Sequence, residues 1–251
     1  EIIKKVNKTI ENIETYIKEN ESKFISDENF ISWTETRAKN MRFNEKYFDK
    51  STEEILGVIS LAIKKEKNYY LRTTQLLSLL MFIYKEKNKG LIEEIATGEG
   101  KSCIISSLSI YYALMGKYVD IISSSYTLAQ RDSEKFKRLF SLFNLSTSYP
   151  RNFEHEPYEV NILYGTFLEF EGDILRELTS DYKIRHPRGY EVIIVDEVDN
   201  LFIDNILGST RLTNSSRGFK FLVPHYFTTY LSVLVIDFCL KLHLRMTLDG
   251  N

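Results

Sequence analysis

Cysteine is scarce in this sequence, with only Cys103 and Cys239, which lie far apart along the chain. So few cysteines argue against a disulfide framework and suit a protein of a reducing compartment. Histidine is also rare, and the spacing of the four histidines does not resemble that of metal ligands. They are His155, His186, His225 and His243. We therefore expect neither a disulfide-stabilised fold nor a metal cluster.

An excess of positive charge is missing as well. The formal net charge is −2 and the pI is about 6.2, so the chain lacks the overall basic field that nucleic-acid-binding proteins usually carry. The sequence begins at Glu1 without a methionine or an apolar signal segment, and we expect an excerpt of a longer polypeptide. With 251 residues, 43% of them hydrophobic, it is long enough to bury a large core.

The chain is organised around the stretch GLIEEIATGEGKS, from Gly90 to Ser102. It predicts a short buried strand, a glycine turn and the start of a helix, an arrangement that binds nucleotide phosphates through backbone N–H groups and the helix N-terminus. In such a turn Lys101 reaches the β- and γ-phosphates and the Ser102 hydroxyl holds Mg²⁺. Ile95 replaces the first glycine of the full P-loop, which leaves the shorter motif I of helicase-like ATPases. The alternative is a plain turn with a solvated lysine.

A second acidic stretch, YEVIIVDEVDNLFID, runs from Tyr190 to Asp204. Its apolar run VIIV predicts a parallel strand buried on both faces. Asp196 and Glu197 follow at the carboxyl end of that strand, where ligands bind in open α/β sheets. In P-loop ATPases an Asp at this place orders the Mg²⁺ shell, and we expect the following Glu to activate the attacking water. Together the two stretches predict an ATP site.

Before residue 90 the apolar residues recur at helical spacing. In residues 1–24 they follow at gaps of three and four, which predicts a helix whose narrow apolar seam packs against the rest of the protein rather than self-associating. We expect one or two short helices in residues 27–50 and a helix that starts at Ser51–Glu54. Another helix is expected from Leu71 to Tyr84.

From Gly90 onwards, strand and helix patterns alternate. Strands are expected at 91–95, 119–125, 160–165 and 191–195, and helices at 101–115, 128–142 and 167–178. Strands that are joined by single helices form βαβ units with a parallel sheet. We therefore predict an α/β fold with a parallel sheet flanked by helices, preceded by an N-terminal helical segment.

These patterns divide the chain into three parts. Residues 1–70 are the N-terminal helical segment, residues 71–205 the ATP-binding lobe, and residues 206–251 a linker followed by an apolar helix. The apolar run at 221–240 is long enough to span a bilayer. It contains Asp237, whose charge is costly in lipid, so we expect a helix that is buried or faces a partner.

Four blocks resemble the SecA preprotein translocase ATPases, in particular their first nucleotide-binding lobe. The family's T-G-E-G-K-T is matched at 97–102, and Y-L-A-x-R-D is matched at 126–132 with one extra residue. The block Y-G-T-x-x-E-[FY]-x-x-D-x-L-R is matched at 164–176, and V-D-E-V-D-x-x-x-I-D at 195–204. Gln75 stands where the family has its adenine-reading glutamine. As a set, these blocks are specific to the family.

The resemblance implies a RecA-like P-loop lobe that binds ATP and Mg²⁺ and serves polypeptide translocation across or into a membrane. It implies a polypeptide substrate, a membrane translocation partner, no nucleic acid, and a cytoplasmic protein that can be peripheral at a membrane. The implied catalytic residues are Glu197, Asp196 and Lys101, and the implied metal-binding residues are Ser102 and Asp196. The implied nucleotide-binding residues are Gln75, Thr97, Gly98, Glu99, Gly100, Lys101 and Ser102. Asp173 and Arg176 are weaker candidates on the polypeptide side.

The sequence departs from the family after Asp204, where Asn205 and ILGSTRL replace the usual continuation. We expect a second RecA-like lobe, with its ATP-contacting arginines, in the longer chain. The lobe alone is then weak or inactive as an ATPase, because the transition-state charge lacks its arginine partner. Two alternatives stay open: a nucleic-acid helicase lobe, which salt-dependent binding to RNA or DNA would reveal, and a non-catalytic scaffold that retains the ATPase fold.

Overall fold

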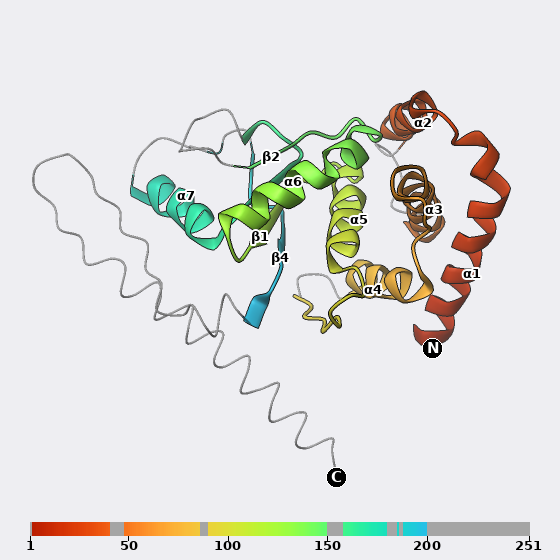
Figure 1. Cartoon of the computed structure of the whole chain (residues 1–251), viewed down its shortest axis with the longest axis horizontal. Helices are drawn as coiled ribbons and strands as arrows, with labels where there is room; N and C mark the ends of the chain where they lie inside the picture. Colours follow the sequence, from red (N-terminus) through yellow and green to blue (C-terminus); the bar gives the residue numbers. More distant parts are fainter. Residues whose placement is uncertain are drawn as a thin grey trace, which may run out of the picture.

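The computed structural model describes residues 2–40, 48–85, 90–149, 158–179, 185 and 188–199. The strands form one parallel sheet in the order β2-β3-β1-β4 (Figure 1). The strands are β1 (Val119–Ser123), β2 (Thr147–Ser148), β3 (Ile162–Thr166) and β4 (Val192–Val195). The predicted α/β class, with a parallel sheet flanked by helices, is confirmed. The short strand β2 was not predicted.

Eight helical elements surround the sheet in the described part of the chain. They are α1 (Ile2–Asn20), η1 (Glu21–Lys23), α2 (Asp27–Asn40), α3 (Phe48–Lys67), α4 (Thr73–Tyr84), α5 (Lys101–Leu114), α6 (Tyr126–Ser141) and α7 (Phe167–Thr179). Among these residues no helix is long and apolar enough to cross a membrane. The expected linker and apolar helix at 206–251 lie outside the described residues.

The sheet is buried between two apolar layers because successive side chains of a strand point to opposite faces. On one face Ile121 and Tyr164 belong to a large cluster that includes residues of α5 and α6. On the other face Ile122 and Leu163 pack with Phe170 of α7. Figure 1 accordingly places α5 and α7 on opposite sides of the strands. The apolar strands β1 and β3 match this two-sided burial. The prediction that VIIV is buried on both faces was wrong, because β4 lies at the edge of the sheet in the described part of the chain, where Ile193 is 54% exposed.

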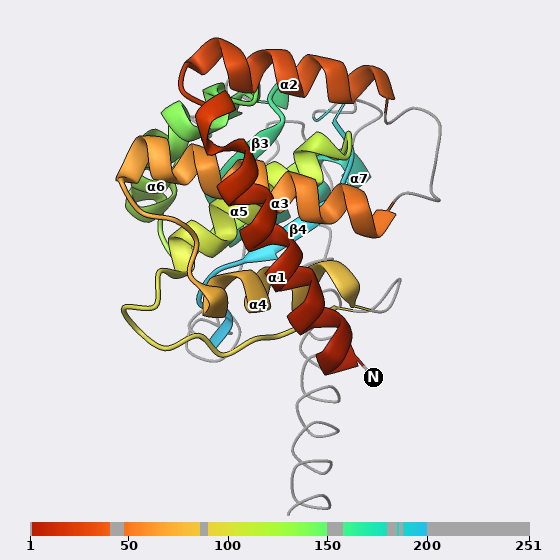
Figure 2. The ribbon, with the colours of Figure 1, turned by 90° about the vertical axis from the view of Figure 1, so that its right-hand side faces the viewer.

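The N-terminal helices join the same core as the sheet. The buried seam of α1 belongs to one cluster with residues of α3, α4 and α5, which confirms that it packs against the protein. Figure 2 shows α1 running across α3. A Cβ atom added at Gly57 of α3 would lie 2.5 Å from Cδ1 of Tyr16, so glycine permits this close approach. The seam residues are Val6, Ile10, Ile13 and Ile17.

Two predicted elements differ in the structure. Residues 91–95 form no strand: no described strand pairs with them, Ile92 is 55% exposed, and Glu93 accepts a hydrogen bond from Ser78 of α4 at 2.7 Å. A strand without a neighbour has no ladder of hydrogen bonds to stabilise it. Helix α3 begins at Phe48 rather than at the predicted start of 51–54. Thr52 therefore lies inside the helix, and its buried hydroxyl lies 2.9 Å from the Tyr111 hydroxyl of α5.

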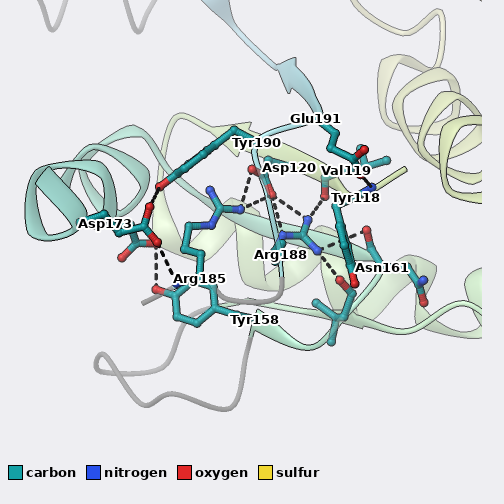
Figure 3. Close-up of polar contacts among 12 residues, drawn as sticks. Tyr118, Val119, Asp120, Tyr158, Asn161, Asp173, Arg185, Arg188, Tyr190 and Glu191 are labelled. Atoms are coloured by element: carbon teal, nitrogen blue, oxygen red, sulfur yellow. Dashed lines mark hydrogen bonds and ion pairs between the residues drawn. The ribbon is translucent and has the colours of Figure 1, made fainter. Parts of the chain in front are cut away.

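A buried charge cluster, which sequence reasoning missed, holds the segment that leads into β4 (Figure 3). Asp120 of β1 lies 2.7 Å from the guanidinium groups of both Arg185 and Arg188, and all three side chains are buried. Arg188 also donates to the carbonyls of Val119 and Val160, at the starts of two neighbouring strands. Burial lowers the pKa of Arg188, which the Asp120 charge opposes. The cluster thereby ties Arg185 and Arg188 to the sheet, shortly before the strand that Asp196 follows.

Candidate nucleotide site

The glycine turn has the backbone conformation that the sequence predicts. Gly98 and Gly100 have φ angles of 89° and 85°, which side-chain-bearing residues rarely adopt. Helix α5 begins directly afterwards, at Lys101. The first N–H groups of a helix have no partner within the helix, and the first turn of α5 contains no acidic side chain. This helix end therefore offers N–H donors and partial positive charge to an anion.

Two side chains from the start of α4 hold the glycine turn. The Gln75 amide nitrogen donates to the Glu99 carbonyl at 2.9 Å, and its oxygen accepts from the Arg72 N–H at 3.0 Å. Arg72 donates to the same Glu99 carbonyl at 2.8 Å and lies 3.2 Å from the Glu99 carboxylate. A Cβ atom at Gly100 would lie 2.6 Å from the Gln75 amide nitrogen, so a larger residue would displace this amide in addition to straining the backbone at a φ of 85°. The structure thus brings Gln75 to the turn, and sequence reasoning gave no such contact for Arg72.

Asp196 and Glu197 follow β4 at its carboxyl end. The Asp196 N–H donates to the Ile122 carbonyl at 2.9 Å, which extends the pairing of β4 with β1 by one residue. Burial raises the pKa of Asp196, the adjacent Glu197 charge raises it further, and the positive charge of Lys101 lowers it. Because the charge of Lys101 affects Asp196, the glycine turn and the acidic stretch lie close enough for their charges to interact.

The start of α6 lies beside the two carboxylates. Ser125 caps the helix by accepting from the Leu128 N–H at 3.3 Å. Arg131 lies 2.9 Å from the carboxylate of Asp132, a buried residue whose hydrogen bond and charge raise the pKa of Arg131. The charges of Asp196 and Glu197 raise it further. Arg131 therefore adds a positive charge near the carboxyl end of β4.

Residues 1–221 match the family model of the SecA DEAD-like domain. The chain belongs to this family. The expected resemblance is thereby confirmed, over more of the chain than the motif blocks cover. The glycine turn at the start of α5 and the acidic pair after β4 lie within the matched region of this SecA DEAD-like domain.

Curated relatives agree with the family. A protein translocase subunit SecA of Cupriavidus metallidurans is 31% identical over 212 residues, which are 81% of this chain and 22% of the relative. Another, of Clostridium acetobutylicum, is 32% identical over 203 residues, 76% of this chain and 23% of the relative. One of Xylella fastidiosa is 38% identical over 122 residues, 46% of this chain and 13% of the relative. The chain thus spans less than a quarter of the length of these relatives.

Asp173 and Arg176 of this SecA DEAD-like domain lie on α7, where they contact each other. Arg176 donates to Asp173 at 3.0 Å as an i,i+3 pair, and the Tyr158 hydroxyl donates to Asp173 at 2.8 Å. Burial raises the pKa of Asp173, while these hydrogen-bonding and charged neighbours lower it. Figure 3 shows Asp173 and Tyr158 beside the buried charge cluster of Asp120.

The oxygen donors near the turn suit a hard cation that also binds phosphate. Among the described residues, no group of three or more His, Cys, Asp and Glu side chains is arranged to hold a metal ion. Mg²⁺ does not need such a group, because it usually keeps several waters and binds one or two protein oxygens together with phosphate oxygens. The Ser102 hydroxyl at the start of α5 and the Asp196 carboxylate are donors of this kind.

Proposed function

We propose that this domain binds Mg²⁺-ATP and is the first motor lobe of an ATPase that drives polypeptide translocation across or into a membrane. The observation that carries the proposal is the glycine turn with positive φ angles directly before Lys101 at the N-terminus of α5, together with Asp196 at the end of β4, whose pKa the charge of Lys101 lowers. A site for a nucleotide with its cation needs a positive side chain and a carboxylate at one place, next to free helix N–H groups. Family membership supports the same function.

In the proposed site, Thr97 to Lys101 wrap the phosphates, with Lys101 neutralising charge on the β- and γ-phosphates. Ser102 and Asp196 hold Mg²⁺, which when bound screens the phosphate charge. Glu197 accepts a proton from the attacking water. Gln75 reads adenine through one donor and one acceptor of its amide.

The wider activity rests on the relatives. Each of those described above is named protein translocase subunit SecA. By that likeness we propose a polypeptide substrate, a membrane translocation partner, and a cytoplasmic protein that binds at the membrane surface. Hydrolysis at a useful rate requires a second RecA-like lobe, whose arginines stabilise the charge of the transferred phosphoryl group.

The test is a titration of the full-length protein with a fluorescent ATP analogue in the presence of Mg²⁺. Lys101→Ala should abolish measurable binding, because the phosphates lose their charged partner. Lys117→Ala is the matched control, since Lys117 follows the other end of α5 and pairs with Glu191 at 2.9 Å. An unchanged dissociation constant for Lys101→Ala would show that residues 98–102 form a turn that does not bind the nucleotide. If the unsubstituted full-length protein binds ATP but does not hydrolyse it, the scaffold alternative is favoured.

A further inference from the structure

We propose that Ser124 is a positioning residue for Glu197, an inference that rests on the proposed function. Three serines follow one another at the end of β1, and the structure gives each a different environment. Ser123 is buried within the strand, and Ser125 caps α6. Ser124 instead donates its hydroxyl hydrogen to a carboxylate oxygen of Glu197, with 2.7 Å between the two oxygens.

The register of the sheet brings these two residues together. Ile122 of β1 pairs with Val195 of β4, and the Asp196 N–H donates to the Ile122 carbonyl. Two residues beyond that pair, Ser124 and Glu197 therefore leave neighbouring strands at the same edge of the sheet. Their hydrogen bond joins positions that are 73 residues apart in the sequence.

The backbone of Glu197 is held in an unusual conformation. Its φ angle is 55°, in the left-handed region that residues with a side chain rarely adopt. Such strained residues persist where surrounding structure fixes them, and they gather at functional sites. With this backbone conformation the Glu197 side chain reaches the end of β1, where its carboxylate accepts the hydrogen bond of Ser124.

The hydrogen bond from Ser124 restricts the Glu197 side chain, which is long and exposed to solvent. An exposed glutamate explores many rotamers, and a general base must lie within hydrogen-bond distance of the water from which it takes a proton. Ser124 occupies one carboxylate oxygen and leaves the other to accept that proton. Ser124 has no hydrogen bond to Asp196 or to Lys101 among those in the described residues, so it should affect the chemical step and not nucleotide binding.

The experiment measures steady-state ATP hydrolysis and Mg²⁺-ATP-analogue binding in the full-length protein. Ser124→Ala should lower kcat by roughly tenfold or more, since small misplacements of reacting groups are costly, and should leave KM and the dissociation constant within about twofold. Ser124→Thr keeps the hydroxyl and should restore most of kcat. Ser125→Ala removes a helix cap without touching Glu197, and should lower thermal stability while kcat stays near that of the parent.

A double variant separates positioning from a general structural effect. If Ser124 acts through Glu197, adding Ser124→Ala to Glu197→Gln should cause no further loss of kcat. A parental kcat for Ser124→Ala, or a fall that Ser125→Ala reproduces, would overturn the proposal. If Glu197→Gln abolishes hydrolysis and Ser124→Ala does not lower it, only this inference fails. If the parent protein does not hydrolyse ATP, or if Glu197→Gln hydrolyses ATP as fast as the parent does, the proposed function fails as well.

Discussion

At the scale of single residues, Asp196 and Glu197 are adjacent in the sequence but differ in their surroundings. Asp196 is half-buried, continues the pairing of β4 with β1, and interacts with the charge of Lys101. Glu197 is exposed, has a positive φ angle, and accepts a hydrogen bond from Ser124. The first environment suits a carboxylate that stays beside a cation, and the second suits one that approaches water. Neutralising each should therefore have a different effect.

Glu197→Gln should keep ATP affinity but lower hydrolysis by roughly 10²-fold or more, because a carboxamide cannot accept the proton of the attacking water. Asp196→Asn should instead weaken the Mg²⁺-dependent part of binding. The measurements are phosphate release and analogue binding with and without Mg²⁺ in the full-length protein. Two variants that bind Mg²⁺-ATP normally and hydrolyse as fast as the parent would make the acidic pair structural, and the scaffold alternative would then replace the motor.

Gln75 has two roles to distinguish, because its amide already contacts the glycine turn through the Glu99 carbonyl. If it reads adenine, Gln75→Ala should lower ATP affinity by about threefold to tenfold, the scale of one or two hydrogen bonds, and lower GTP affinity less. Competition of ATP and GTP against a fluorescent analogue measures both. Equal losses for the two nucleotides would leave Gln75 only the role of holding the turn. Arg72→Ala, which also removes a contact to Glu99, is the comparison.

At the scale of elements, β4 has two supports that lie close in the sequence but differ in burial. Arg188 joins Asp120 inside the protein, whereas Glu191 pairs with Lys117 at the surface. A buried charge that loses its partner is costly because water cannot solvate it, while an exposed ion pair contributes little. The position of the acidic pair after β4 thus depends on a cluster that lies toward the other end of the strand.

Asp120→Asn should therefore lower the free energy of unfolding by about 3–5 kcal/mol, the range for breaking a buried ion pair, because it leaves the buried guanidinium groups of Arg185 and Arg188 without their carboxylate. Lys117→Ala should change it by about 1 kcal/mol or less. Urea denaturation followed by circular dichroism measures both variants. Equal effects would show that Arg185 and Arg188 are not anchored through Asp120.

At the scale of the whole molecule, the net charge of −2 gives no general attraction to nucleic acid. We expect no steep salt dependence of binding to single-stranded RNA or duplex DNA. A protein that neutralises six to ten phosphates loses about 10³- to 10⁵-fold in affinity between 50 and 200 mM salt. Fluorescence anisotropy at those two salt concentrations tests this, with an unfolded polypeptide as the comparison ligand. A salt slope of that size would favour the helicase alternative over translocation.

The turns, strands and helices were predictable from the sequence where they depend on residues that are close together in the chain. The glycines at 98 and 100 predicted the turn, because glycine adopts positive φ angles freely. The apolar runs predicted the parallel strands β1, β3 and β4, but only β1 and β3 are buried on both faces, since β4 lies at the edge of the described sheet. Helix bounds agreed to within a few residues, as for α5 and α7. The family followed from the same blocks.

What the sequence by itself determined is therefore the α/β class, the family and the two stretches of the candidate nucleotide site. Only the tertiary structure decided that residues 91–95 remain outside the sheet, since a strand depends on a neighbour as well as on its own residues. It also decided that Asp120 meets two arginines more than sixty positions away and that Ser124 meets Glu197. Such contacts leave no periodic pattern along the chain, because they arise from strand register and packing and not from local propensity.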